Sequence, residues 1–416
     1  MHFAMIRVMF DAFLEPLRIY LLPTLTVVFS FWYIWLPAMF IMGFWHIWVN
    51  FKRREFHFNQ GFVLLEMRLP KDISKSPAAM EAVLNHFYQT AGEATFIDRY
   101  INGKTRAWFS LELVSIEGQV RFFIWSRKNL RNLIEAQLYA QYPSIEIHEV
   151  PDYALPVVSD PSTNTMWGCE FDLTKPDAYP IKTYIDYGLD RDPDEEFKID
   201  PLASLTEYLG SIGRGEQIWI QIIIRAHKKE RKKAGTWFGT VDWTDDAKKE
   251  IEKLRKQSII DSEGEKSRVS VLTEGTKDTI AAIERSIGKT PFDCGIRGIY
   301  IADKDVFNPI NITGLTGAFK SFSSQDHNGF KPARGLTGFD YPWQDYADIR
   351  KNKKKADLLD AYKRRSYFHL PAASPSFVLT NEEVATLYHF PGQSVATPTF
   401  TRIPSRKAEA PSNLPI

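Results

Sequence analysis

The residues whose types and spacing come nearest to a chemical motif are two Gly-Lys-Thr triplets, at 103–105 and 288–290. This triplet ends the P-loop, G-x-x-x-x-G-K-[ST], in which backbone amides and the lysine hold nucleotide phosphates. The P-loop also requires a glycine five residues before the glycine of the triplet, and this chain has Asp98 and Ile283 at those positions. We therefore predict that neither triplet binds a nucleotide.

The context of each triplet predicts a structural role instead. The pair Asn102-Gly103 is typical of a turn. Gly288 follows a helical pattern over 275–287, which is the position expected of a C-cap glycine.

No other pattern in the chain predicts catalysis. Cys169 and Cys294 are far apart, which fits buried thiols in a reducing compartment and no disulfide framework. The sequence has no metal-binding cluster of the C-x-x-C or H-E-x-x-H kind, and no nucleophile can be paired with a base. The formal net charge of +1 excludes a general positive field for nucleic acid. We predict that the chain is not an enzyme and has no catalytic, cofactor or metal site.

The N-terminal part predicts a membrane anchor. From Ile19 to Phe51 there is no Asp, Glu, Lys or Arg, and about 20 apolar residues span a bilayer core. We predict a transmembrane segment over 19–51, tilted or kinked near Pro37, and an amphipathic interfacial helix over 1–18. The alternative is a buried helix of a soluble core. The residues that we assign to the anchor are Trp32, Trp35, Trp45, Trp48, Lys52, Arg53 and Arg54.

The three basic residues also predict the orientation. They follow the uncharged run directly, and the positive-inside rule places such residues in the cytoplasm. We expect a single-pass protein of the cytoplasmic membrane whose soluble domains are cytoplasmic.

The soluble part predicts an α/β (α+β) fold of two units. Residues 60–150 have the order β-α-β-β-α-β, with a hairpin turn at Glu117-Gly118, which is the split βαβ or ferredoxin-like plan. Residues 160–325 predict a second α/β unit of the same kind, with strands that include 181–187, and with a charged insertion over 227–270. We expect an irregular or helical connector over 326–375, then a capped helix and an extended Pro-rich tail over 376–416.

The charged insertion permits two interpretations. One is a solvated surface segment, because runs of charge are usually solvated. The other is contact with the phosphates of lipid headgroups or DNA. A second basic run, 350–355 with Lys363, Arg364 and Arg365, favours the latter only weakly. The residues of the candidate phosphate contact are Lys228, Lys229, Arg231, Lys232 and Lys233.

The C-terminal part carries a family resemblance. Thr380 and Glu383 predict a capping box at the start of a short helix. The chain resembles the N-terminal region of membrane-linked type IV secretion and conjugation-like proteins of reduced-genome bacteria, which precedes a HerA/FtsK-type DNA-translocating ATPase domain. The stretches that carry the resemblance are 109–150, 200–225, 292–302, 378–391 and 410–415.

The resemblance implies a partner. The chain stops about where the motor domain of that family would begin, so we expect a scaffold that anchors or couples a separately encoded P-loop ATPase, or else a truncated chain. A membrane-tethered nucleic-acid-binding module is the alternative, and a homo-oligomer is a further candidate assembly. The residues that we expect to contact the ATPase, or else to cap this protein's own core, are Leu387, Tyr388, His389 and Phe390.

Overall fold

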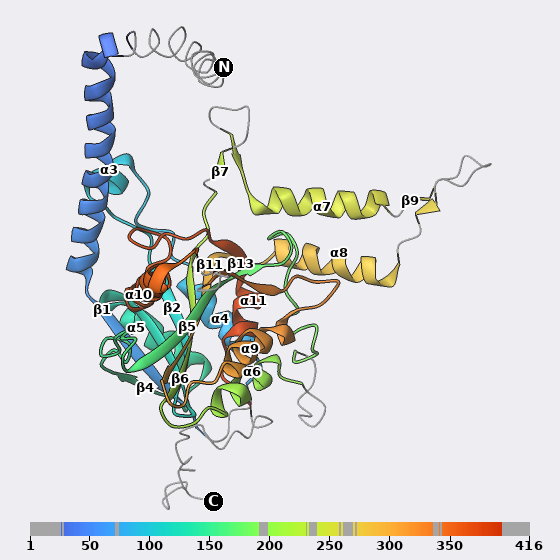
Figure 1. Ribbon diagram of the computed structural model, residues 1–416. Helices are drawn as coiled ribbons and strands as arrows, with labels where there is room; N and C mark the ends of the chain where they lie inside the picture. The colour runs from blue at the N-terminus through green and yellow to red at the C-terminus, as the bar shows by residue number, and fades with distance from the viewer. Residues whose placement is uncertain are drawn as a thin grey trace, which may run out of the picture. The chain divides into compact units, whose positions relative to one another are not determined.

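The chain forms two compact units in the computed structural model (Figure 1). The anchor unit comprises Met1–Asn59 with Glu93–Thr105, and the sheet unit comprises Gln60–Gly92 with Arg106–Ile416. The predicted interfacial helix over 1–18, Lys233 and the tail beyond 392 lie outside the described residues. The structure describes residues 26, 29–70, 75–190, 199–229, 231–232, 239–257, 259–260, 269–270, 273–335, 341 and 343–392.

The sheet unit is built on a nine-stranded antiparallel sheet, which confirms a mixed α+β fold. Its order is β12-β5-β11-β6-β2-β3-β1-β4, and β13 pairs with β11. The strands are β1 (Phe62–Arg68), β2 (Trp108–Ile116), β3 (Gln119–Arg127), β4 (Glu146–Glu149), β5 (Asn164–Leu173), β6 (Glu216–Ala226), β11 (Pro291–Asp303), β12 (Phe330–Gly335) and β13 (Phe377–Thr380). Two short ribbons pair β7 (Arg231–Lys232) with β8 (Thr240–Val241) and β9 (Ile259–Ile260) with β10 (Val269–Ser270).

The first half of the sheet has the element order β1-α4-β2-β3-α5-β4 and the strand order β4-β1-β3-β2. Its helices are α4 (Ala78–Phe87) and α5 (Arg131–Gln141). The predicted hairpin turn is confirmed: Glu117 and Gly118 have φ of 52° and 82°, and two-residue hairpin turns favour positive φ at both positions because their twist matches that of the strands.

The second half repeats this plan. Its elements run β5-α6-β6-β11-α9-β12 and its strands β12-β5-β11-β6, so the halves meet where β6 pairs with β2. The helices are α6 (Pro201–Gly210) and α9 (Ile310–Ala318). Two long helices, α7 (Trp243–Gln257) and α8 (Glu274–Ile287), are inserted between β6 and β11. We call this pair the arm; Figure 1 shows its helices side by side.

The predicted strand over 181–187 is wrong, because its backbone donors bond to side chains of α11 (Asn381–Leu387) and of a local turn. The amide of Ile181 donates to Glu383 at 2.9 Å, and the amide of Tyr184 donates to Thr386 at 3.1 Å. The segment is therefore a turn that holds α11 against the sheet.

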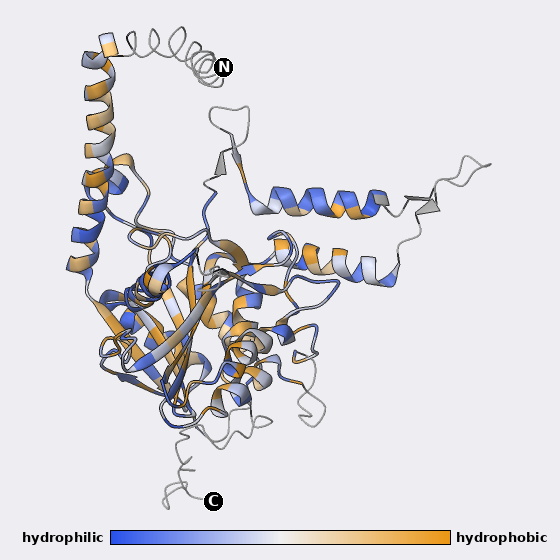
Figure 2. Cartoon of the chain, viewed as in Figure 1, coloured by the Kyte–Doolittle hydropathy of each residue, from blue (hydrophilic) through white to orange (hydrophobic). Residues whose placement is uncertain are grey.

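Helices cover both faces of the sheet (Figures 1 and 2). Helices α4, α5, α6, α9 and α11 share one core cluster, and α10 (Ile349–Lys363) belongs to the cluster on the other face. Strand β6 contributes to both clusters by alternation, Ile218, Ile220 and Ile222 to the first, Trp219 and Ile223 to the second. This two-sided burial explains why its sequence is an almost continuous apolar run.

The described part of the anchor unit contains one long helix and a loop. Helix α3 extends over Trp32–Gln60 with Pro37 inside it. The loop, Glu93–Thr105, contains a short π-helical turn at Ile97–Ile101.

Candidate membrane anchor and charged arm

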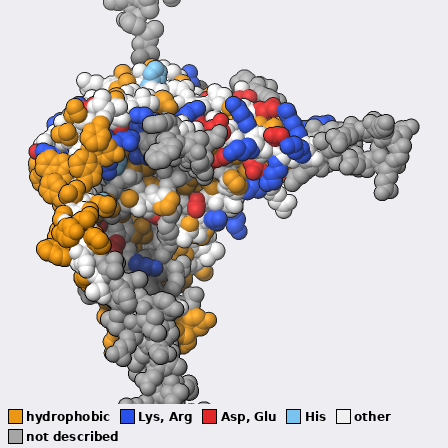
Figure 3. All heavy atoms as spheres, turned by 90° about the horizontal axis from the view of Figure 1, so that it is seen from above, with side chains coloured by type: hydrophobic (Ala, Val, Ile, Leu, Met, Phe, Trp, Pro, Cys, Tyr) orange, Lys and Arg blue, Asp and Glu red, His pale blue; other side chains and the backbone are white. Residues whose placement is uncertain are grey.

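Helix α3 has the dimensions and surface of a membrane span. It is the one helix in the described part that is long and apolar enough to cross a membrane, and only 6% of its apolar window is buried. At 1.5 Å per residue it is about 44 Å long, against about 30 Å for a bilayer core. Figure 2 colours much of α3 as hydrophobic, with hydrophilic residues toward its C-terminal end, and Figure 3 shows exposed hydrophobic side chains gathered in one region.

The structure places all seven predicted anchor residues on this helix. Trp32, Trp35 and Trp45 are 56%, 36% and 41% exposed. The ammonium group of Lys52 lies 5.3 Å from the ring centre of Trp48 and pairs with Glu55 at 2.7 Å. The helix continues past the predicted end at Phe51, so the basic residues 52–54 are part of it.

The first Gly-Lys-Thr triplet attaches the loop to α3. Gly103 has φ of +63°, and a Cβ there would lie 2.3 Å from the backbone carbon of Lys52. Lys104 pairs with Asp98 at 2.8 Å, and the Thr105 hydroxyl lies 2.8 Å from Nε2 of His57. The glycine therefore permits a close approach of two backbones, which is one of the main uses of glycine.

The second triplet ends α8, and its half-buried lysine pairs with two carboxylates. Gly288 is the C-cap of α8, as predicted. Lys289 pairs with Glu81 at 2.7 Å and with Glu382 at 3.3 Å, and Thr290 donates to Asn85 at 3.1 Å. Burial lowers the pKa of Lys289, but the two carboxylates outweigh it and the pKa is raised. Its charge is thus used within the protein.

The arm has a small apolar core and a paired charged surface. Trp243, Ala247 and Ile251 of α7 pack with Ile280 and Ile283 of α8. Figure 3 shows Lys and Arg side chains mixed with Asp and Glu over the arm. Its ion pairs have N–O distances of 2.8 Å for Lys249–Asp246, 3.3 Å for Lys253–Glu250, 2.6 Å for Lys256–Glu252 and 2.8 Å for Arg255–Glu284.

The predicted phosphate contact lies at the base of the arm. Lys229 pairs with Asp242 at 3.3 Å, and Lys228 lies beside it in the chain. The backbone of Arg231 and Lys232 forms β7, while their side chains, like Lys233, are outside the described part. The Lys229 side chain is 63% exposed as well as paired, which fits the interpretation as a solvated segment.

A half-buried histidine joins the arm to the sheet. His227, after β6, has Nδ1 2.6 Å from Asp293 of β11 and Nε2 2.9 Å from Asp242 before α7. Arg225 also donates to Asp293 at 2.8 Å. Burial lowers the pKa of His227, but the two carboxylates raise it by more, so the pKa is raised overall. The sequence had no signal for this cluster, because its members come from separate elements.

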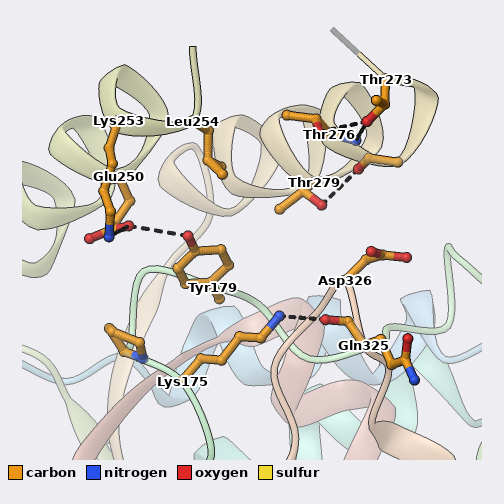
Figure 4. Close-up of a pocket in the computed structure, with 12 residues that line it drawn as sticks. Lys175, Tyr179, Glu250, Lys253, Leu254, Thr273, Thr276, Thr279, Gln325 and Asp326 are labelled. Atoms are coloured by element: carbon orange, nitrogen blue, oxygen red, sulfur yellow. Dashed lines mark hydrogen bonds and ion pairs between the residues drawn. The ribbon is translucent and has the colours of Figure 1, made fainter. Parts of the chain in front are cut away.

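An open cavity of about 450 Å³ lies between the arm and the loops at 175–179 and 325–326 (Figure 4). Tyr179 donates to Glu250 at 3.1 Å, and Lys175 donates to the backbone of Gln325 at 2.6 Å. Hydroxyl groups of α8 face the cavity from the other side (Figure 4). Among the described residues no group of three or more His, Cys, Asp or Glu could hold a metal ion.

The four residues expected to contact an ATPase are buried in the sheet unit. Leu387, Tyr388, His389 and Phe390 are at most 1% exposed. Tyr388 donates to the backbone of Phe123 at 3.0 Å, and the ring of His389 lies 3.1 Å from Asp200. The structure therefore corrects the expectation of an exposed docking segment and agrees with the alternative, a cap on this protein's own core.

Comparison with known proteins identifies a family. Residues 99–402 match the family described as Domain of unknown function (DUF8128). The chain belongs to the DUF8128 family. The matched residues include the arm, α10 and α11, whereas α3 precedes them. No curated protein matches the chain.

Arg365, which the sequence groups with a basic run, lies in the core of the sheet unit. Arg365 is fully buried and forms a two-pronged pair with Glu112, at 2.9 and 3.1 Å, and a pair with Asp152. Glu112 also accepts from Gln221 at 3.1 Å and from Tyr153 at 2.8 Å. Arg365 therefore adds nothing to an exposed basic run, because its side chain, just after α10, reaches the buried face of β2.

Proposed function

We propose that the protein is a non-catalytic membrane anchor and coupling component of a type IV secretion-like translocation machine. In this proposal it holds a separately encoded P-loop ATPase of the HerA/FtsK type at the cytoplasmic face of the cytoplasmic membrane. The observation that carries the proposal is α3, an exposed apolar helix that ends in the basic residues 52–54.

The sheet unit supports a scaffold role. We propose that its halves are two ferredoxin-like units, because both have the element order β-α-β-β-α-β and the same strand order. Joined through β2 and β6, they form one continuous sheet. Such units serve many functions, so the fold alone does not choose one.

The arm is the surface that we propose for the ATPase. Its α7 lysines Lys249, Lys253 and Lys256 have side chains 69%, 61% and 70% exposed, so they are accessible from solution although each has an intrahelical partner. Exposed ion pairs contribute little to stability. The protein therefore loses little stability when a partner's charges replace these ion pairs. Charges at an interface also give specificity.

The test is a pull-down of the tagged full chain from native membranes in detergent, with the bound proteins identified. The test variant is Lys249→Glu with Lys253→Glu, and the control is Lys353→Glu with Lys354→Glu on α10, which changes the charge equally. We expect a P-loop ATPase with the wild type and the control, and its loss with the α7 variant. Recovery of no ATPase from the wild type would contradict the coupling role.

Membrane anchoring is tested separately. A helix like α3 also occurs in signal sequences, so the intact mass of the membrane-bound protein is measured together with its resistance to alkaline carbonate. We expect a carbonate-resistant protein that retains α3. A protein that is released by carbonate, or that lacks α3, would contradict the anchor.

A further inference from the structure

The loop of the anchor unit has an apolar surface that a single membrane-spanning helix does not explain. The loop leaves the sheet unit after Gly92 and returns to it at Arg106. Within it Phe96, Ile97 and Ile101 are 61%, 57% and 46% exposed. Three large apolar side chains within six residues are costly in water, since each exposes surface that burial would stabilise.

One end of the loop lies level with the basic residues of α3. Gly103 approaches the backbone of Lys52 and Arg53 so closely that a Cβ would lie 2.3 and 2.6 Å from their atoms. Thr105, which is fully buried, contacts His57 at 2.8 Å. This end of the loop is polar, and the basic residues mark the membrane boundary under the positive-inside rule.

The other end of the loop lies along the apolar part of α3. The ring of Trp45 is 6.1 Å from the ring of Phe96 and 5.7 Å from that of Tyr100. Trp45 precedes Lys52 by two helical turns, or about 10 Å along the axis. The loop therefore extends from the level of the basic residues into the level of the apolar segment.

The charges of the loop are compensated within it. Asp98 pairs with Lys104 at 2.8 Å and accepts from Thr95 and Asn102 at 2.8 and 3.3 Å. Arg99 pairs with Glu93 at 3.5 Å. These pairs lower the cost of moving the turn out of bulk water, because a paired charge is less costly to desolvate than a lone one.

We propose that the segment Phe96–Ile101 inserts into the interfacial layer of the bilayer that α3 spans, as a second membrane contact. The proposal rests on the membrane anchoring proposed above. The occupant is lipid because the exposed apolar side chains continue the surface of α3 and lie just beyond its basic boundary. Amphipathic segments at this depth bury their apolar face about 5–10 Å into the headgroup and acyl boundary.

The test measures the depth of labelled cysteines in the full chain, reconstituted in phosphatidylcholine and phosphatidylglycerol vesicles. The native Cys169 and Cys294 are fully buried and do not compete for the label. An NBD fluorophore is placed on Ile97→Cys in the loop, on Met42→Cys in α3, or on Lys256→Cys in the arm. Met42 is 72% exposed, and the Lys256 side chain is 70% exposed. Lipids that carry a nitroxide at the headgroup or deep in the acyl chain quench the label.

We expect the label at position 97 to be quenched most by the headgroup nitroxide, the label at 42 by the deep nitroxide, and the label at 256 by neither. Gly103→Val, which detaches the loop from α3, should reduce quenching at 97 and leave quenching at 42 unchanged. If 42 is unquenched, membrane anchoring itself is wrong. If 42 is quenched while 97 behaves like 256, only the second contact is wrong. If NBD emission at 97 indicates an apolar environment but nitroxide lipids do not quench it, then protein, such as a second copy, covers the loop. That result would also overturn the proposal.

Discussion

The triplets at 103–105 and 288–290 have the same three residues, but a different residue has the main structural role in each. In the anchor unit the glycine matters, because Gly103 has φ of +63° and lies against the backbone of α3. In the sheet unit the lysine matters, because Lys289 compensates Glu81 and the almost fully buried Glu382. Gly288 has φ of −80°, and a Cβ there would lie 3.5 Å from its nearest neighbour.

This difference reflects how each unit is held together. The anchor loop is attached by a close backbone approach and by stacked rings. The sheet unit instead contains buried ion pairs, such as Arg297–Glu170 at 2.9 Å. We therefore expect the stability of the sheet unit to depend on its charges and on pH. We expect the attachment of the anchor loop to depend on its backbone conformation.

The largest expected effect is that of Lys289→Met. It leaves the buried Glu382 paired with Arg285 at 3.2 Å but without the lysine, and removing one partner of a buried carboxylate is strongly destabilising. We expect the free energy of unfolding of the sheet unit to fall by about 3 kcal/mol, measured by urea unfolding followed by hydrogen exchange. Lys104→Met, the matched change in the other triplet, should leave it unchanged. Equal effects of the two changes would break the comparison.

Gly103→Ala should act on the anchor loop. A Cβ at this position requires a strained φ and meets the backbone of Lys52, so we expect the attached loop to lose about 2 kcal/mol relative to the detached one. Hydrogen exchange of 93–105 should become faster while that of the sheet strands stays the same. Unchanged exchange in the loop would show that the backbone approach is unimportant.

The pH response should be confined to the sheet unit and the base of the arm. The pKa of His227 is raised, because its carboxylate partners outweigh burial. A raised pKa means that the protonated histidine contributes stability below its unfolded pKa, and that this contribution is lost as pH rises through the folded pKa. Exchange in α7 and α8 should therefore be slower at pH 6 than at pH 8.5 after correction for the intrinsic rate. The difference should shrink in His227→Gln; a difference that persists would assign it to other groups.

The smallest expected effect is that of Gly288→Ala. Its φ is accessible to alanine and its surroundings leave room, so we expect the free energy of unfolding to change by about 0.5 kcal/mol or less. Thermal unfolding of the sheet unit should be close to that of the wild type. A loss comparable to that of Lys289→Met would show that the glycine matters in both triplets.

Local features of the fold were predictable because a few neighbouring residues decide them. The capping box of Thr380 and Glu383 is present. Asp200, a residue type favoured at helix N-caps, caps α6 and accepts a bond from the amide of Leu202. By contrast Ser126, a residue type that favours helix N-caps, lies in β3, because pairing with Val63 of β1 extends that strand. A local cap preference is weaker than a row of strand hydrogen bonds.

Long-range features of the candidate site were not predictable. Arg365 and Glu112 are 253 positions apart and are partners only because α10 covers the face of β2. The segment 387–390 is apolar enough for an interface or a core, and packing decided for the core. The sequence predicted a charged insertion that contains the lysines of the arm. It did not predict their ion pairs, which form because α7 places residues three and four positions apart on one face.

The sequence by itself determined the apolar helix with its basic end, the hairpin turn at Glu117-Gly118, and the capping box of Thr380 and Glu383. These depend on the period of apolar residues and on the conformational range of a few residue types. Tertiary structure alone decided which residue of each Gly-Lys-Thr triplet matters, which charges are buried, and that the loop 93–105 lies along α3. The physical reason is that a side chain's free energy depends on what it contacts, and those contacts join segments that the chain order keeps far apart.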